Sequence, residues 1–151
     1  MTSFSPKDPN FETRVRASFL RQNAMTTLGI EIANLAAGEI ELRMPYCKDY
    51  AQQHGFIHAG IMATALDSAC GYAAYTLMPE EAGVLTVEFK INLLAPAQGD
   101  HFLFRASVTK PGRTITVCDA QAFALQGAQQ KLVATMTGTL MALFDRAGIA
   151  H

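Results

Sequence analysis

The sequence predicts an α+β domain in which a curved antiparallel sheet wraps one long central helix. The stretch 59–77 consists of small and apolar side chains with one charged residue, Asp67, which indicates a helix without a polar face. The segments after it alternate apolar and polar residues and are joined by turns too short for parallel crossovers. A sheet that wraps the helix is therefore expected, because only such a sheet buries it all round.

Composition favours one compact domain over residues 1–151, since the chain is 50% hydrophobic and has no charge-rich block. The net charge is -1 and the 12 Lys and Arg residues are dispersed, so neither nucleic acid nor an anionic membrane is expected as a partner. A membrane span at 59–77 is not expected either, because Ala, Gly, Thr and Ser dominate it and Asp67 is central.

Cysteine usage and the N-terminal sequence point to the cytoplasm. The 3 cysteines are far apart and form no C-x-x-C pair, which argues against a disulfide framework and against a zinc site. The N-terminal sequence has no basic region followed by an apolar run, so no signal peptide is expected. His54 and His58 have i,i+4 spacing but lie in a predicted loop with no following Glu, so no metal is expected.

Two elements and a loop are expected before the central helix. Asp8 and Pro9 are a helix-start signal, and the apolar periodicity after them predicts an amphipathic helix over 9–23. Residues 29–46 read as a two-stranded hairpin that turns near Gly38. A polar loop then leads to the central helix, predicted over 58–78 and closed by Pro79.

Four strands are expected after the helix, as a meander over 83–144. The clearest strand alternates polar residues with five apolar ones, which are Leu85, Val87, Phe89, Ile91 and Leu93. Turns at 110–113 and 126–128 separate the later strands.

Asp67 is the strongest candidate for a functional residue. Burying an unpaired carboxylate costs several kcal/mol or forces it to protonate, so such groups are usually paired or functional. A structural carboxylate within a buried polar network is the alternative to a catalytic group.

The segment QQHGFIHAGIMATALDSACGYAA, residues 52–74, closely resembles the signature of the PaaI-like acyl-CoA thioesterases of the hotdog-fold superfamily. In that family an Asn or Gln precedes a His-Gly-Gly segment at the start of the hotdog helix, and an acidic residue follows two turns later. Gln52, His58-Ala59-Gly60 and Asp67 fill this pattern here. The resemblance implies a hotdog fold and hydrolysis of an acyl-CoA to a carboxylic acid and CoA, with no metal and no redox cofactor.

The residues themselves suit this chemistry. The first helix amides, at Ala59 and Gly60, lack intrahelical partners and lie at the positive end of the helix dipole, so they can receive a thioester carbonyl. Asp67 can act as general base on water or as nucleophile through an anhydride, and both routes stay open. His58 is expected to orient the helix start by hydrogen bonding rather than to act as a base.

The spacing within the helix predicts a shared site. Ala59 and Asp67 are separated by a rise of about 12 Å along an α-helix, too far for both to touch one carbonyl carbon. The resemblance implies a homodimer in which one subunit gives the amide and the other the carboxylate. Dimers of such dimers, homotetramers, are also common in the family.

The resemblance suggests roles for two further residues. A Ser or Thr at the start of the following strand holds the attacking water in some relatives, and Thr86 occupies that place. Alternation puts Thr86 on the polar face with Glu88 and Lys90, from which it reaches a site only on a neighbouring subunit. Arg113, in the turn that starts at Lys110, is either a surface charge or a contact to the CoA phosphates.

Several alternatives stay open at this point. The first Gly of the family motif is Ala59 here. A Gln at the position of Gln52 is found in a branch of the family whose acidic residue is Glu rather than Asp, so the branch of this chain is undecided. A non-catalytic acyl-CoA-binding or sensing protein on the same fold is the second functional hypothesis, and hydratase chemistry the third. Ser68 and Cys70 are assigned no catalytic role. Three alanines leave room for an aliphatic or aryl acyl group: Ala63, Ala69 and Ala73.

Overall fold

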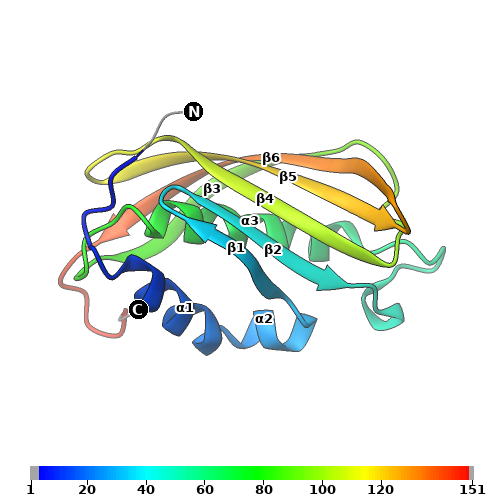
Figure 1. Cartoon of the computed structure of the whole chain (residues 1–151), viewed down its shortest axis with the longest axis horizontal. Helices are drawn as coiled ribbons and strands as arrows, with labels where there is room; N and C mark the ends of the chain where they lie inside the picture. Colours follow the sequence, from blue (N-terminus) through cyan, green and yellow to red (C-terminus); the bar gives the residue numbers. More distant parts are fainter. Residues whose placement is uncertain (1–3, 150–151) are drawn as a thin grey trace.

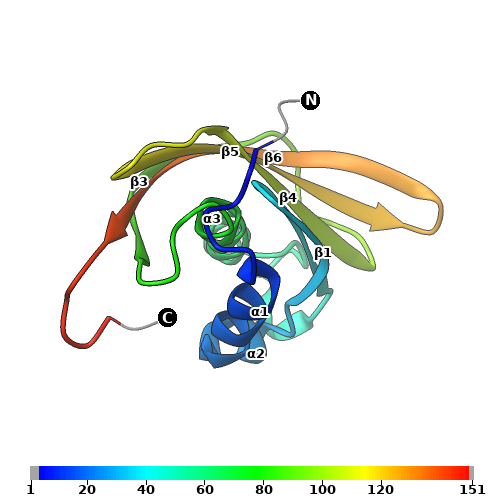
Figure 2. The same cartoon turned by 60° about the vertical axis from the view of Figure 1, so that its left-hand side comes forward.

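The computed structural model describes residues 4–149, which form one six-stranded antiparallel sheet and a long helix under its concave face (Figures 1 and 2). The sheet order is β1-β2-β4-β5-β6-β3. The strands are β1 (Glu31–Ala36), β2 (Glu39–Pro45), β3 (Gly83–Leu93), β4 (His101–Lys110), β5 (Ile115–Gln126) and β6 (Gln129–Leu143). The helices are α1 (Phe11–Arg21), α2 (Asn23–Leu28), the short 3-10 helix η1 (Lys48–Tyr50) and α3 (Ala59–Tyr75). The α+β architecture with a curved sheet around a central helix is confirmed.

The N-terminal helix predicted over 9–23 is shorter, and the second helix α2 follows it. It begins at Phe11 because Asp8 caps a turn before it, with the Asn10 N–H donating to Asp8 Oδ1 at 2.8 Å. It ends at Arg21, since Gln22 has an extended backbone (φ -81°, ψ 95°), and α2 follows directly.

Arg14 ties α1 to the far end of α3. Its Nε lies 2.7 Å from Asp8 Oδ2, and its Nη2 donates to the carbonyl oxygens of Tyr75 (3.2 Å) and Met78 (2.8 Å). The guanidinium also lies over the Tyr75 ring, 4.1 Å from the ring centroid. One side chain thus donates to two carbonyl groups at and just after the end of the helix, where intrahelical donors run out.

The four strands after α3 do not form a simple meander. β4, β5 and β6 do lie side by side, but β3 pairs with β6 at the sheet edge, and β4 pairs with β2. The connection 94–100 therefore passes three strand spacings of about 4.8 Å each, which seven residues easily span. Strand β3 consequently has one hydrogen-bonded neighbour in the chain and one open edge.

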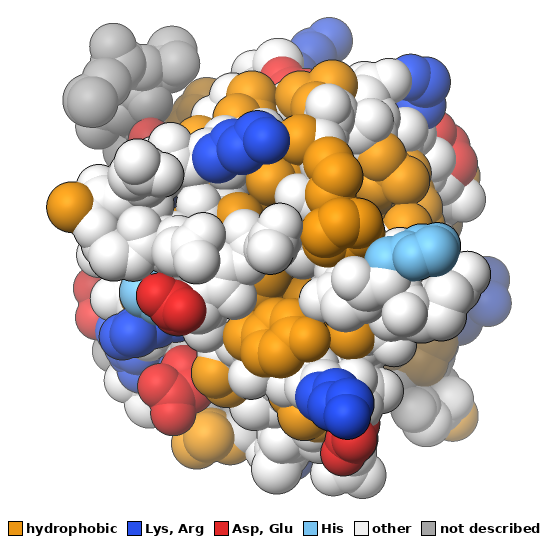
Figure 3. Space-filling view, turned by 90° about the vertical axis from the view of Figure 1, so that its right-hand side faces the viewer, with side chains coloured by type: hydrophobic (Ala, Val, Ile, Leu, Met, Phe, Trp, Pro, Cys, Tyr) orange, Lys and Arg blue, Asp and Glu red, His pale blue; other side chains and the backbone are white. Residues whose placement is uncertain are grey.

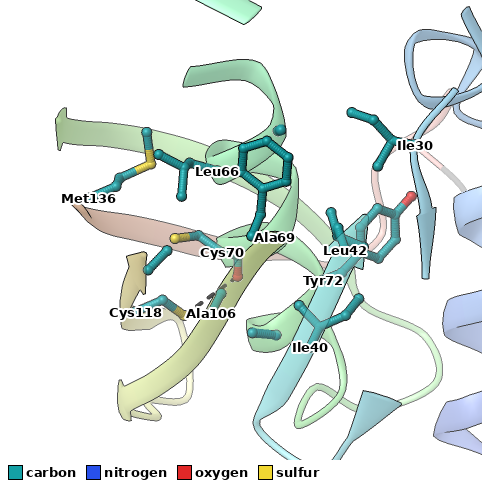
Figure 4. Packing of buried hydrophobic residues seen from close by; sticks show 14 of the residues in the cluster. Ile30, Ile40, Leu42, Leu66, Ala69, Cys70, Tyr72, Ala106, Cys118 and Met136 are labelled. Carbon is teal, nitrogen blue, oxygen red and sulfur yellow. Dashed lines mark hydrogen bonds between the residues drawn. The ribbon is translucent and has the colours of Figure 1, made fainter. Parts of the chain in front are cut away.

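Helix α3 packs on the sheet through small and apolar residues (Figure 4). Leu66, Ala69 and Cys70 are fully buried there, and Cys118 Sγ donates to the carbonyl oxygen of Cys70 at 3.5 Å. Burial raises the pKa of Cys118 to about 12 and raises that of Cys70 further, so both groups stay thiols at neutral pH. Within residues 4–149 no helix is long and apolar enough to cross a membrane.

The sheet does not bury α3 on all sides, contrary to the expectation. One stripe of the helix is exposed or half-buried, and its members are Gly60, Ala63, Thr64, Asp67 and Gly71. These residues recur three and four apart, so they lie on one helix face. The charged residue therefore stands on the open face and not in the core.

Candidate active site

His58 caps the start of α3. Its backbone is extended (φ -58°, ψ 137°), and its Nδ1 accepts a hydrogen bond from the Gly60 N–H at 2.9 Å. A Cβ at position 60 would lie 3.1 Å from this Nδ1, so glycine lets the imidazole approach the backbone. The predicted pair of free amides is therefore reduced by one, because His58 occupies the Gly60 N–H.

The Ala59 N–H is the remaining donor at the helix start. Among residues 4–149 no acceptor is hydrogen-bonded to it, and it lies at the positive end of the 17-residue helix. Ala59 lines a cavity of about 680 Å³, which we call the helix-start cavity. Figure 3 shows this end of the molecule, where apolar side chains gather near the centre of the face.

Gln52 lines the same cavity and also holds the loop before the helix. Its side-chain oxygen accepts from the His54 N–H, while its backbone N–H donates to the Phe56 carbonyl at 2.8 Å. The tight turn this requires is made by Gly55, whose φ is +85°. The side-chain oxygen of Gln52 is thus used within the loop, and its amide NH₂ group is the part suited to an acceptor in the cavity.

Asp67 is half-buried and hydrogen-bonded. The Thr86 hydroxyl donates to Asp67 Oδ1 at 2.7 Å, which fixes the carboxylate orientation. Burial raises the pKa of Asp67, and the hydrogen bond from Thr86 lowers it in part. A carboxylate whose pKa is raised towards neutrality is a stronger base than an ordinary Asp.

A β-bulge aims Thr86 at Asp67. Thr86 lies opposite Leu140 of β6, but Glu88 lies opposite Thr139, so the register shifts at Val87. Because of this extra residue Thr86 faces the helix together with Phe89, whereas Glu88 points to the convex face. The predicted placement of Thr86 on the polar face with Glu88 is therefore wrong, and Thr86 reaches the carboxylate of its own chain.

A second cavity of about 210 Å³ adjoins the carboxylate, and we call it the Asp67 cavity. Its lining residues are Gln22, Asp67, Ser68, Gly71, Tyr72, Val84, Leu85 and Thr86. None of them lines the helix-start cavity. The two halves of the predicted site are thus separate within one chain, in agreement with the 12 Å estimated from about eight helical residues.

Arg113 lies far from the helix-start cavity of its own chain. It is exposed in the turn between β4 and β5, beside Thr114, whose carbonyl accepts from the Ala142 N–H at 2.8 Å. The helix-start cavity is lined by Ala134, which lies eight residues before Ala142 on β6. Eight residues of a strand correspond to about 26 Å, so Arg113 and this cavity are at opposite ends of β6. A contact between Arg113 and the substrate therefore stays a prediction that needs a second subunit.

Two residues of the Asp67 cavity could not be found by sequence motifs. Gln22, at the junction of α1 and α2, accepts a hydrogen bond from the Ser68 hydroxyl at 3.5 Å. The periodicity of 9–23 shows no break at this position, so nothing in the sequence separates Gln22 from a surface glutamine. The Ser68 side chain is buried and forms part of the wall of this cavity, and no catalytic role is assigned to it.

Comparisons with known proteins show the family and the fold of this chain. The model of the thioesterase superfamily matches residues 54–131, a segment that includes His58, Asp67 and Thr86. A crystal structure of a thioesterase family protein from Silicibacter pomeroyi is 58% identical, covers 89% of this chain and 99% of its own, and superposes with a TM-score of 0.88. The E. coli PaaI protein from the phenylacetic acid degradation operon is 22% identical, covers 89% and 94% of the two chains, and has a TM-score of 0.80, a likeness of fold.

A sequence relative gives a consistent result. A protein of Halobacterium salinarum, provisionally named an esterase, is 33% identical over an alignment of 100 positions that covers 63% of this chain and 66% of that protein. The match thus spans just under two thirds of this relative. With the family match over more than half of the chain and the near-complete overlap with the Silicibacter protein, the chain belongs to the thioesterase superfamily and has the hotdog fold of its PaaI-like members.

Proposed function

We propose that this protein hydrolyses acyl-CoA thioesters to a free carboxylic acid and CoA, at sites shared by two subunits of a homodimer. Membership of the thioesterase superfamily supports thioester hydrolysis in general. The observation that carries the proposal is the Asp67 carboxylate, half-buried beside a cavity, oriented by Thr86 and with a raised pKa. A purely structural carboxylate gains nothing from an adjoining cavity.

Ala59 supplies the oxyanion site in this proposal. As the thioester carbonyl is attacked, its oxygen gains negative charge, which the Ala59 N–H and the positive end of the α3 dipole stabilise. The Gly60 N–H serves instead to hold His58, which fixes the helix start. Gln52 is placed to donate its amide NH₂ group to the same carbonyl region.

Asp67 activates the nucleophile. As a general base it takes a proton from water, whose oxygen bonds to the carbonyl carbon while the carbon–sulfur bond breaks. The departing CoA thiolate then takes that proton from Asp67, so the enzyme returns to its starting state. In the alternative route Asp67 itself attacks the carbonyl carbon, and the carbon–sulfur bond breaks to release CoA thiolate. Water then hydrolyses the resulting anhydride, which frees Asp67 and supplies the proton that CoA takes up. In both routes Thr86 holds Oδ1 and leaves Oδ2 to react.

The exposed surface of β3 supports a homodimer. Four large apolar side chains on this edge strand are 42–56% exposed, and they are Leu85, Val87, Phe89 and Leu93. An open strand edge flanked by apolar side chains is a surface that a second chain covers. In a two-fold dimer such contact brings the Ala59 of one subunit towards the Asp67 of the other, and dimers of dimers are compatible with it.

The cellular setting of the proposal is the cytoplasm, where CoA thioesters are used and thiols stay reduced. Cys47, Cys70 and Cys118 are free thiols in the structure. Arg113 of a neighbouring subunit remains the proposed contact for the CoA phosphates, since a guanidinium binds phosphate in a bidentate way.

The test is CoA release from short, medium, long and aromatic acyl-CoAs, followed with a thiol-reactive dye. We expect turnover by the wild type and a loss of at least about a hundredfold in kcat for Asp67→Asn, an isosteric change. Asp119→Asn is the matched control, because Asp119 also accepts threonine hydrogen bonds, from Thr137 at 2.7 Å and from Thr109 at 2.6 Å, but on the convex face. Absence of turnover would favour an acyl-CoA-binding role instead, and an Asp67→Asn variant as active as the wild type would reject Asp67 as the base or nucleophile.

A further inference from the structure

We infer that the Asp67 cavity holds the acyl group of the substrate and that Gly71 sets the size of the group that fits. The inference deepens the proposed function and rests on it for the identity of the reacting group. The carbonyl carbon that Asp67 acts upon carries two substituents, the acyl chain and the CoA sulfur. Each must occupy a space next to the carboxylate.

The size of the cavity assigns it to the smaller substituent. Its volume is about 210 Å³. This corresponds to about seven non-hydrogen atoms, if each takes about 30 Å³, the volume of one water molecule in the liquid. CoA is several times larger than this, so the cavity cannot hold CoA as a whole, whereas it can hold a compact acyl group completely. The reactive end of the acyl group then lies against Asp67 and Thr86, which line the wall.

Gly71 keeps this space open. It lies four residues after Asp67, one turn along the same open face of α3. A Cβ built there meets no atom within 4 Å, in contrast to Gly60 and Gly138, where it would meet His58 and Cys70. Packing within the chain therefore gives no reason for a glycine, although glycine inside a helix is less stable than alanine. The absent side chain enlarges the cavity.

The three alanines that were expected to leave room for the acyl group, Ala63, Ala69 and Ala73, do not provide it. Ala69 and Ala73 are fully buried against the sheet, so neither reaches the open face. Ala63 is on the open face, one turn before Asp67, but it lines neither cavity. The expected substrate class is thus a compact acyl group of up to about seven non-hydrogen atoms, for which Val84 and Tyr72 provide apolar lining.

The test measures binding of S-alkyl-CoA thioethers of increasing chain length, which have no thioester to hydrolyse. Isothermal titration of the wild type should give a Kd that falls about fourfold per methylene and levels off after about seven carbons. In Gly71→Leu the levelling should come after about three carbons, because four added carbons fill about half of the cavity. Gly71→Ala should bring the levelling about one carbon earlier, and it keeps the test valid if Gly71→Leu fails to fold.

Ala63→Leu is the matched control, since it adds a leucine on the same open face outside the cavity, and it should keep the wild-type length dependence. Three results would overturn the assignment. The chain-length limit could stay in place in both Gly71 variants, it could move in Ala63→Leu instead, or the Kd could be independent of chain length. Dissociation of the oligomer by Gly71→Ala would also overturn it and would show that the gap admits a partner helix.

Failure of this inference can be distinguished from failure of the proposed function. A length limit that Gly71→Leu shortens, in a protein that turns over no thioester, upholds the acyl cavity and rejects hydrolysis. Turnover that Asp67→Asn abolishes, together with a limit that Gly71→Leu leaves in place, upholds hydrolysis and rejects the cavity.

Discussion

At the scale of single residues, the properties of the Asp67 carboxylate come from two opposing effects. Burial disfavours the charged form and raises the pKa, whereas the Thr86 hydroxyl stabilises the charged form and lowers it. A general base must be ionised before it can accept a proton, so the activity should decline as the pH falls through this raised pKa.

Replacing Thr86 by valine should move the acidic limb of the kcat/KM–pH profile to higher pH. The change removes the hydrogen bond that lowers the pKa of Asp67 but keeps the size of the side chain, so burial then acts alone. Thr86→Ser retains a hydroxyl and should restore the wild-type limb. An acidic limb at the same pH in Thr86→Val and the wild type would contradict the role given to this hydrogen bond.

Asp67→Asn should raise thermal stability at neutral pH while it removes activity. Because the pKa of Asp67 is raised in the folded state, the unfolded state loses this proton at a lower pH, and ionised Asp67 disfavours folding at pH 7. That penalty disappears as the pH falls through the folded and then the unfolded pKa. The difference in Tm between variant and wild type should therefore shrink on acidification, which thermal scans at pH 7 and pH 4 would measure.

Some of these residue positions could be predicted from the sequence and others could not. Asp67 could be located because it is the one charged residue in the apolar stretch 59–77, and His58 because it fills the motif at the start of the predicted helix. Thr86 was placed on the wrong face, because a bulge at Val87 is a property of the pairing with β6 and leaves no mark in a single strand. The occupation of the Gly60 N–H by His58 depends on a side-chain rotamer, which the sequence does not determine.

At the scale of elements, the attachment of α1 to α3 depends on Arg14. This side chain is only 10% exposed and contacts Asp8 and two carbonyl groups at the end of α3. The hydrogen bond from the Asn10 N–H, followed by the interactions with Arg14, lowers the pKa of Asp8, so the pair stabilises the fold above the ordinary Asp pKa and is lost in acid.

Arg14→Met should lower the Tm clearly more than Arg16→Met. Both substitutions remove a guanidinium from α1, but Arg16 is exposed, whereas loss of Arg14 removes the ion pair with Asp8 and one hydrogen bond to each of the Tyr75 and Met78 carbonyls. The comparison is a pair of thermal scans at pH 7, and equal Tm values for the two variants would show that the attachment is unimportant.

Element order was easier to predict than element pairing. The alternation in 83–93 and the turns near 111 and 127 fixed where the later strands lie, because both are local properties. The partner of β3 is decided by the loop 94–100 and by competition among strands for β6, which are not local. The open face of α3 was missed for the same reason, since the extent of the sheet around it depends on that strand order.

At the scale of the whole molecule, the proposed site combines a helix start and a carboxylate that one chain keeps apart. This division can be tested by mixing two inactive variants. Ala59→Pro removes only the N–H, since proline is tolerated at the first helical position and His58 already has the extended backbone that a following proline requires. It should lower kcat by about 10²–10³.

Mixed and reassociated 1:1, Ala59→Pro and Asp67→Asn should recover about one quarter of wild-type activity, because half of the dimers are mixed and each has one complete site of two. Activity no greater than that of either variant alone would show that each chain builds its own site. Size-exclusion chromatography before and after mixing confirms exchange of subunits.

The edge strand β3 carries both Thr86 and the exposed apolar residues proposed to meet a second chain. Dilution therefore has a kinetic consequence. Below the dissociation constant of the dimer, the number of complete sites rises with the square of the protein concentration, so the rate per milligram falls in proportion to dilution. With the shared site proposed above, each doubling of expression in this concentration range would raise the activity fourfold.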